Sequence, residues 1–320
     1  MNELDQKDIN CAEGSHCPPV LFLIFNRPDL TEQSFAAIRE ARPSKLFVAA
    51  DGPRIGREGE NELCEQTRKI ATAVDWPCEV KTLFRDENLS CDIAVSEAIS
   101  WFFKNIEFGI ILEDDCLPHV SFFQFCHQMD SFYASDNRVM HVSGNDFLPQ
   151  EYPRQFDYRF TQLIHSWGWA TWRRSWDLFD FDMLLPDGVT DEDIVKNNQM
   201  PEGEVRYWIK KISELREGRK DVWDYRWFFC IWKNHGVCIC PTANLVENTG
   251  YDDRATNTLS GEPLNGTVRG ISFPVLCPET TEPDRQADRA VVKRLHLEVG
   301  IHKPMSLIRR VKKKLRDFIR

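Results

Sequence analysis

The sequence predicts an α/β protein with a mostly parallel sheet that is covered by helices on both faces. Between residues 18 and 118, short apolar runs alternate with stretches of helical periodicity, which is the pattern of βαβ units. The apolar runs are nearly continuous, as expected for strands that are buried on both faces. The chain has 320 residues, 42% of them hydrophobic, and is therefore long enough to bury a sizeable core.

The first predicted unit is a strand at residues 18–25, "PPVLFLIF", followed by a helix at residues 26–43. The apolar run from Val20 to Phe25 is typical of a buried strand. In the helix, Asp29 and Glu32 have the spacing of a capping box.

The alternation continues in the same way. The second strand ends in an Asp-Gly turn, and each later strand follows a helix. The predicted elements are a strand at 44–52, a helix at 60–74, a strand at 78–85, a helix at 91–103 and a strand at 108–115.

The second half of the chain is less regular. A Trp-rich stretch at 165–180 is expected to begin a helix at its end, and residues 241–290, rich in Thr, Asn, Gly and Pro, are expected to form a long loop or cover. The other predicted elements are a helix at 120–134, a strand at 138–147, polar helices at 191–218, an aromatic helix at 222–236 and a short strand at 237–241. We therefore divide the chain into a polar segment at 1–17, a domain at 18–290 and a basic tail at 291–320.

The charge is unevenly distributed. The net charge is −10, yet residues 303–320 hold eight Lys and Arg residues and one Asp. Apolar residues recur there at helical spacing, which indicates a basic amphipathic helix that lies on an anionic membrane surface or packs on its own domain. Nucleic-acid binding is not expected, because the acidic remainder of the chain would repel phosphate.

A cytoplasmic protein is expected, because no apolar run is long enough to span a membrane and the N-terminus has no signal-peptide pattern. The eleven cysteines are scattered without a C-x-x-C pair, so we interpret them as core residues rather than metal or redox groups.

Polar residues follow each of the four predicted strands. Because the carboxyl ends of parallel strands share one rim, where α/β sheets bind ligands, we expect these residues to converge. They are Asn26-Arg27, Asp51-Gly52, Arg85-Asp86 and Glu113-Asp114-Asp115.

The acidic triplet, residues 113–115, has two interpretations. Carboxylates at the end of a strand suit a hard divalent cation, Mn²⁺ or Mg²⁺, that takes further ligands from a phosphate. The alternative is a solvated acidic turn. The position after an apolar run and before "CLP" favours the metal site. Neither GxGxxG nor a P-loop occurs, so no other phosphate site competes with it.

Three further stretches are ambiguous. "WGWATW", residues 167–172, is either a ligand-lining loop or ordinary core, and core is the commoner case. In "DVWDYRWFF", Asp221 and Asp224 lie in an aromatic run, where a carboxylate in a desolvated pocket is a plausible general base. The alternative is that Asp221 caps the start of the helix and Asp224 forms an ion pair with Arg226 or Lys220. "ENTGYDDRATNT", residues 247–258, either closes over a nucleotide or is a plain surface loop.

Taken in order, these pieces resemble the GT-A glycosyltransferases, most of all the branch of N-acetylglucosaminyltransferase I and its bacterial relatives. The resemblance covers roughly residues 18–258, and the metal motif with its following Pro and Phe residues is the most specific part. That branch tends to carry two adjacent acids where this chain has Asp224-Tyr225. The matching stretches are "VLFLIFNRPDL", "FVAADGPR", "ILEDDCLPHVSFFQF", "HVSGND", "HSWGWATWRRSW" and "WDYRWFF".

The resemblance implies a GT-A fold, with a nucleotide-binding half at 18–118 and a less regular acceptor half at 119–290. It implies a hexosyl- or N-acetylhexosaminyltransferase that moves a sugar, with inversion, from a UDP-linked donor to a glycan acceptor. The implied roles are Asp115 as the Mn²⁺ ligand, Glu113 and Asp114 near the ribose and diphosphate, Asp51 at the uracil ring, Asn26, Arg27 and Arg85 around the nucleotide, Trp167, Gly168 and Trp169 by the donor sugar or acceptor, and Asp224 as the base.

The chemistry of sugar transfer agrees with that set of residues. Negative charge develops on the leaving diphosphate, and a divalent metal stabilises it. Inversion then needs one carboxylate to take the proton of the acceptor hydroxyl.

Two other functions stay open. A sugar-phosphate nucleotidyltransferase should have a Gly-rich loop after the first strand, but "NRPDLTEQ" has no glycine. A non-catalytic glycan- or membrane-binding module with a decayed site is left open by Tyr225, although the intact acidic triplet argues against decay.

Overall fold

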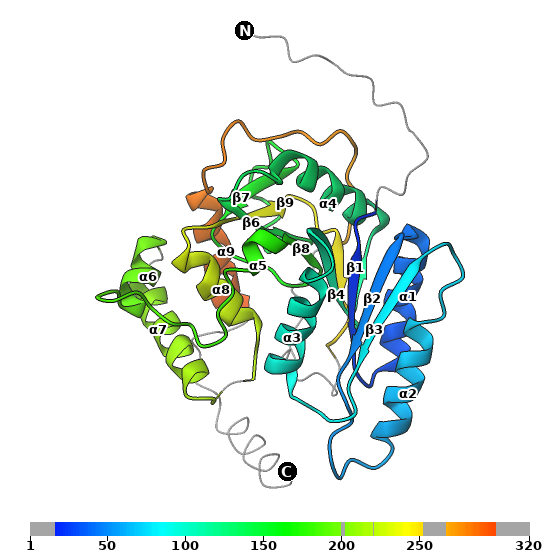
Figure 1. Cartoon of the computed structure of the whole chain (residues 1–320). Coiled ribbons are helices and arrows are strands. Elements are labelled where there is room, and N and C mark those ends of the chain that lie inside the picture. Colours follow the sequence, from blue (N-terminus) through cyan, green and yellow to red (C-terminus); the bar gives the residue numbers. More distant parts are fainter. Residues whose placement is uncertain (1–16, 200–201, 220, 252–266, 299–320) are drawn as a thin grey trace.

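The computed structural model describes residues 17–199, 202–219, 221–251 and 267–298 (Figure 1). Within these residues, eight strands form one sheet, and a pair of short strands, β5 (Cys116–Pro118) and β10 (Val246–Asn248), forms another. The strands of the large sheet, from edge to edge, are β3 (Glu79–Phe84), β2 (Lys45–Ala50), β1 (Val20–Ile24), β4 (Phe108–Glu113), β8 (Trp169–Trp172), β6 (Val139–Ser143), β9 (Val237–Pro241) and β7 (Tyr158–Thr161).

The sheet is mostly parallel, with a Rossmann-like arrangement of its first four strands. The pairs β3–β2, β2–β1 and β1–β4 are parallel, as is β6–β9. Strands β8 and β7 run antiparallel to their neighbours. The predicted α/β class is therefore confirmed.

The residues of β1 show why helices cover both faces of the sheet. Val20, Phe22 and Ile24 belong to one core cluster, whereas Leu21 and Leu23, which alternate with them, belong to another. Successive side chains of a strand point to opposite faces, so each cluster lies on its own face. The first face carries α1 (Pro28–Ala41), α2 (Glu60–Ala71) and α4 (Val120–Tyr133), and the second carries α3 (Cys91–Phe103), α5 (Arg173–Trp176) and α8 (Asp224–Lys233) (Figure 1).

The predicted elements between residues 18 and 115 are all present, and α3 has the predicted bounds. The capping box at Asp29 and Glu32 was wrong. The helix begins at Pro28, with Arg27 as the N-cap and no side-chain cap. Proline at the first helical position has a φ suited to the helix and lacks one of the N–H groups that have no partner in the first turn, so the helix begins before Asp29.

The second half contains elements that local patterns did not predict. Strand β8 lies inside the Trp-rich stretch and is inserted antiparallel between β4 and β6. The expected loop at 241–290 contains β10, and its end contains the start of α9 (Arg285–Glu298). Helices α6 (Asp191–Asn197) and α7 (Glu202–Arg216) match the predicted polar helices.

Helix α9 joins the second core cluster through Ala287 and Val291. Its Asp288 accepts hydrogen bonds from Arg159 Nη1 at 2.8 Å and from the backbone N–H of Gln162 at 3.1 Å. This polar anchor is formed by residues far apart in the sequence, which explains why local periodicity missed the helix.

Most cysteines of the described part of the chain are buried, as expected for core residues. In the described ranges, no helix combines the length and the apolar character needed to cross a membrane. Most of the N-terminal segment at 1–17 and the whole of the basic stretch at 303–320 lie outside the described residues, so the membrane-surface prediction for the tail stays a prediction.

Two buried histidines predict a marked acid sensitivity of the fold. His141 is fully buried and stacks on Trp169, with 5.0 Å between ring centroids, and His165 is buried beside it. Burial lowers the pKa of His141 to about 3 and that of His165 to about 4. Below about pH 6.5, the unfolded state therefore binds more protons than the native state, and the stability falls as the pH decreases.

We expect each of these histidines to reduce the free energy of unfolding by about 2 kcal/mol between pH 7.5 and pH 5. Urea unfolding at pH 7.5 and pH 5 measures the loss of unfolding free energy between the two pH values. In the His165→Gln variant, this loss should be smaller than in the parent by that amount. The exposed His127→Gln variant serves as the control and should keep the parental loss. An unchanged pH dependence in His165→Gln would contradict the buried neutral histidine.

Candidate functional site

The candidate site lies where the carboxyl ends of β1 and β4 meet. From β1, the chain continues to β2 and β3 on one side of the sheet and then crosses to β4 on the other side. Ligands of open α/β sheets bind at such a topological switch point. Arg27 follows β1, and Glu113, Asp114 and Asp115 lie at the end of β4, so the structure brings these predicted residues together at that point.

Arg27 bridges two carboxylates of the triplet. Its Nη2 forms an ion pair with Asp114 Oδ1 and a second one with Asp115 Oδ2 at 2.9 Å, and its Nε donates to Asp114 Oδ2 at 3.3 Å. The Arg27 side chain is 15% exposed and the Asp114 side chain 5%. The pairing is therefore largely shielded from water, where charge interactions are stronger than at the surface.

Negative charge exceeds positive charge in this cluster. Burial, with the charges of Asp115 and Asp114, raises the pKa of Glu113 to about 8. Burial also raises the pKa of Asp114 to about 6, although Arg27 opposes that shift. Asp224 adds to the rise at Glu113 and so lies close enough to interact with it. Among the described residues, the ion pairs formed by the triplet involve Arg27 alone.

The backbone around Asp115 is held by two other segments. Ser34 Oγ of α1 donates to the Asp114 carbonyl at 3.0 Å, and Thr249 donates to the Asp115 carbonyl through its N–H at 2.8 Å and its hydroxyl at 3.1 Å. A Cβ atom on Gly250 would overlap Asp115 Oδ2, so a larger residue there would displace the Asp115 carboxylate. The start of the loop at 247–258 therefore contacts the triplet, and its remainder, from 252, lies outside the described residues.

Asp224 is the first residue of α8, and contacts between α8 and α3 fix its position. Asp221 accepts hydrogen bonds from the backbone N–H groups of Cys91 at 3.3 Å and Asp92 at 2.7 Å, so it caps α3. Arg226 donates to Asp92 at 2.8 Å. Of the two suggested ion-pair partners of Asp224, Arg226 was therefore wrong, because the buried Asp92 carboxylate is its partner. The other, Lys220, lies outside the described residues, so that alternative stays a prediction. Asp224 lies at the same rim as Glu113.

The other predicted nucleotide-binding residues have protein partners at the rim. Asp51 accepts hydrogen bonds from the N–H groups of Leu89, at 3.0 and 3.1 Å, and Gly52, at 3.0 Å, and burial raises its pKa. Asn26 Nδ2 donates to Glu60 at 2.9 Å. Arg85 pairs with Glu97 at 3.0 Å.

The aromatic stretch divides into an accessible and a buried part. Trp167 is partly exposed and makes edge contacts with Phe147 and Tyr251, at centroid distances of 4.9 and 6.1 Å. Gly168 has φ +63°, and a Cβ atom there would lie 2.8 Å from Val246 of β10. Trp167 and Gly168 thus lie next to the segment that contacts Asp115.

Trp169, by contrast, is only 1% exposed. It stacks on Trp223, with 5.4 Å between ring centroids, and also on His141, which is buried in the core. We therefore correct the expectation that Trp169 lies by the donor sugar or acceptor, because its ring is part of the core.

Sequence reasoning missed a buried polar network next to the site. Arg159 donates to both carboxylate oxygens of Asp146, at 3.0 and 3.1 Å, and to Asp288. Ligand atoms of Asp146, His165 and Cys240 lie within 4.8 Å of one another, a spacing that also suits a metal. The Arg159 guanidinium already occupies the Asp146 carboxylate, and burial keeps the pKa of Cys240 well above its usual value, so this group is a structural network. Its members are scattered along the chain and left no local signal.

No family model matches the sequence, and no curated protein matches it. One solved structure with a local likeness is the inositol-1-phosphate CTP transferase from T. maritima. It is 10% identical over 49% of this chain and 72% of the other chain, with a TM-score of 0.27. A likeness at that score carries no functional argument.

Proposed function

We propose that this chain is a metal-dependent glycosyltransferase with a GT-A fold, which transfers a sugar from a UDP-linked donor to a glycan with inversion. The observation that carries the proposal is the cluster of Arg27, Glu113, Asp114 and Asp115 at the β1–β4 switch point, where carboxylates outnumber cations. This is the place at which an α/β sheet binds a nucleotide, and the excess charge favours a cation.

The donor set fits Mn²⁺ or Mg²⁺. Hard divalent cations take carboxylate oxygens at the protein and the remaining ligands from phosphates and water. Asp115 would be the protein ligand through Oδ1, because its ion pair with Arg27, at 2.9 Å, involves Oδ2 alone. When bound, the metal supplies electrostatic stabilisation of the leaving diphosphate. Glu113 and Asp114 then lie beside the ribose and diphosphate.

Residues around the cluster position the substrates. Arg27 and Asn26 flank the nucleotide, and Asp51 holds the turn at Leu89 where the uracil ring is proposed to lie. Trp167, partly exposed beside the segment that contacts Asp115, offers an aromatic face to the donor sugar or the acceptor. Asp224 takes the proton from the acceptor hydroxyl, which is the general-base step that inversion requires.

The turn after β1 argues against a sugar-phosphate nucleotidyltransferase. Only Phe25, Asn26 and Arg27 separate β1 from α1, and none of them is glycine. A loop of that length has few backbone N–H groups with which to bind a triphosphate. A non-catalytic module is less consistent with the buried, mutually repelling carboxylates, because such a cluster is costly unless it binds a cation.

The experiment is a thermal-shift series with UDP, GDP, CDP, dTDP and CTP, each with Mn²⁺ or with EDTA. At about 100 times the Kd, a ligand that binds the native state adds about 2.7 kcal/mol of stability, or roughly 5 °C for a chain of this size. We expect this rise only when UDP and Mn²⁺ are both present, and neither for UDP with EDTA nor for the other nucleotides.

A shift with CTP and none with UDP would favour nucleotidyl transfer. No shift with any nucleotide would remove the glycosyltransferase proposal and favour the binding module.

A peripheral position on the inner face of the membrane, through residues 303–320, is a separate part of the proposal and rests on the charge pattern of that segment.

A further inference from the structure

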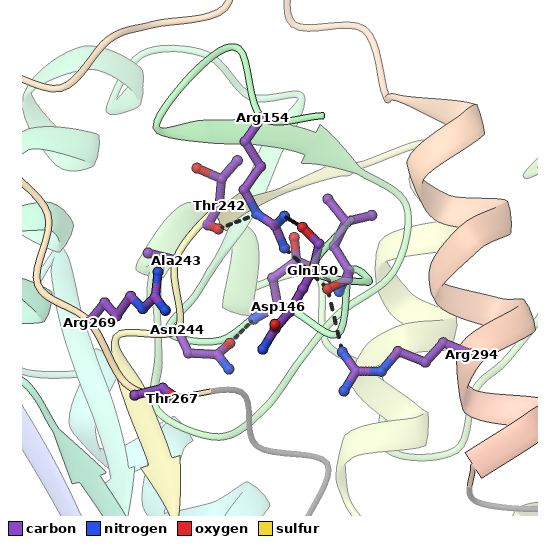
Figure 2. A pocket seen from close by; sticks show the side chains of 10 residues that line it. Asp146, Gln150, Arg154, Thr242, Ala243, Asn244, Thr267, Arg269 and Arg294 are labelled. Carbon is purple, nitrogen blue, oxygen red and sulfur yellow. Dashed lines mark hydrogen bonds between the residues drawn. The ribbon is translucent and has the colours of Figure 1, made fainter. Parts of the chain in front are cut away.

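A pocket with mainly positive charge lies at the segment that leads into β10 and, through β10, to the acidic cluster. Its volume is about 360 Å³. The residues that line it are Asp146, Leu148, Gln150, Arg154, Thr242, Ala243, Asn244, Thr267, Arg269 and Arg294 (Figure 2). Three of them are arginines and one is an acid, in a chain whose net charge is −10.

The one acid of the pocket, Asp146, is ion-paired from behind by a guanidinium that also pairs with Asp288. Both oxygens of Asp146 accept hydrogen bonds from the buried Arg159, at 3.0 and 3.1 Å. The charge that faces the pocket therefore comes mainly from Arg154, Arg269 and Arg294, which reach it from separate segments (Figure 2).

Two of the three guanidinium groups are fixed in place. Arg154 donates to the carbonyls of Thr242, Gln150 and Tyr152, at 2.8, 2.8 and 3.0 Å, and also to two carbonyls at positions 148 and 149. Arg294 of α9 donates to the Phe147 carbonyl at 3.1 Å. Cations held in this way lose little entropy when an anion binds, which favours binding.

The third guanidinium is available to a ligand. The Arg269 side chain is exposed, and among the residues that the structure describes it has no hydrogen bond or ion pair. Its backbone N–H donates to the Asn244 carbonyl at 2.9 Å, which holds the residue at the pocket. A guanidinium with free N–H groups forms paired hydrogen bonds with carboxylate or phosphate oxygens.

The pocket is connected to the proposed active site by the segment that leads into and includes β10. Asn244 lines the pocket, and four residues later Asn248 of β10 lies opposite Cys116, next to Asp115. A span of four extended residues is roughly 13 Å. A glycan bound with its reacting sugar at the acidic cluster can therefore place a sugar further along its chain, beyond the adjacent one, in the pocket.

We propose that this pocket binds an oxyanion, a carboxylate or phosphate carried by a sugar, and that the acceptor is a negatively charged glycan. The second half of this inference rests on the proposed function. The first half concerns binding alone and needs neither metal nor nucleotide.

Ligand-detected NMR titrations test the pocket in EDTA without nucleotide, where the acidic cluster repels anions. The probes are glucuronate, glucose 6-phosphate, glucose and inorganic phosphate. We expect the two anionic sugars to bind, glucose not to bind, and the Arg269→Gln variant to lose about tenfold or more in affinity. The control variant Arg206→Gln, which changes an exposed arginine of α7, should bind as the parent does.

Three results would overturn the proposal: equal binding of glucose and glucuronate, equal affinity in Arg269→Gln and the parent, or no binding of any probe. Inorganic phosphate that binds as tightly as the sugar anions would remove the acceptor assignment and leave a site for free phosphate. Because these titrations contain no UDP and no Mn²⁺, their failure is distinct from failure of the glycosyltransferase proposal.

Discussion

The Asp115→Asn variant is expected to lose Mn²⁺ binding while it stays folded. The substitution keeps the shape of the side chain but removes the charge that a hard cation needs. Loss of residues around a metal ligand typically costs 10–100-fold in affinity, so the loss of a direct ligand should cost more than roughly 100-fold. Manganese EPR, in which the signal of the free ion reports the unbound fraction, measures this directly.

The stability of Asp115→Asn separates metal binding from folding. Arg27 keeps its ion pair with Asp114, and the removal of one of several like charges relieves repulsion at Glu113. We therefore expect the free energy of unfolding without metal to stay close to that of the parent. The matched control is Asp75→Asn, which removes an exposed carboxylate paired with Arg39 at 3.1 Å. Parental Mn²⁺ binding in Asp115→Asn would show that Asp115 is not a metal ligand.

The first half of the chain was predictable because its signals are local. Apolar runs such as Val20–Ile24 are long enough to indicate buried strands, and the parallel pairing of β1 with β2 and β4 follows from the intervening helices. The convergence of Arg27 with Asp114 and Asp115 followed from the same rule, since strand ends of a parallel sheet share an edge.

The second half depends on contacts between distant residues, which local patterns do not contain. The apolar sequence of β8 also fits core or loop, and its strand conformation results from insertion between β4 and β6. Helix α9 is anchored through Asp288 to Arg159, and the three pocket arginines come from positions 154, 269 and 294. No spacing in the sequence indicates that these residues meet.

The Asp224→Asn variant is expected to bind donor and metal but to turn over slowly. General bases contribute about 10²–10⁴-fold to the rate, and the amide cannot take the proton of the acceptor hydroxyl. Donor and Mn²⁺ affinity should stay within about twofold of the parent, because Asp224 begins α8 and is not part of the Arg27 pairing. The measurements are UDP release from the donor and calorimetric titration of donor with Mn²⁺.

The control for Asp224 is the same substitution three residues earlier. Asp221 caps α3 by accepting hydrogen bonds from Cys91 and Asp92, one on each carboxylate oxygen. The single carbonyl oxygen of asparagine keeps the shorter of the two, from Asp92, and asparagine is a good helix cap, so Asp221→Asn should keep parental turnover. Equal loss in both variants would mean that the α8–α3 contact, rather than proton transfer, is what the substitutions disturb. Full activity in Asp224→Asn would instead point to Glu113 as the general base. Its pKa of about 8 is close to neutral pH, where a general base works best.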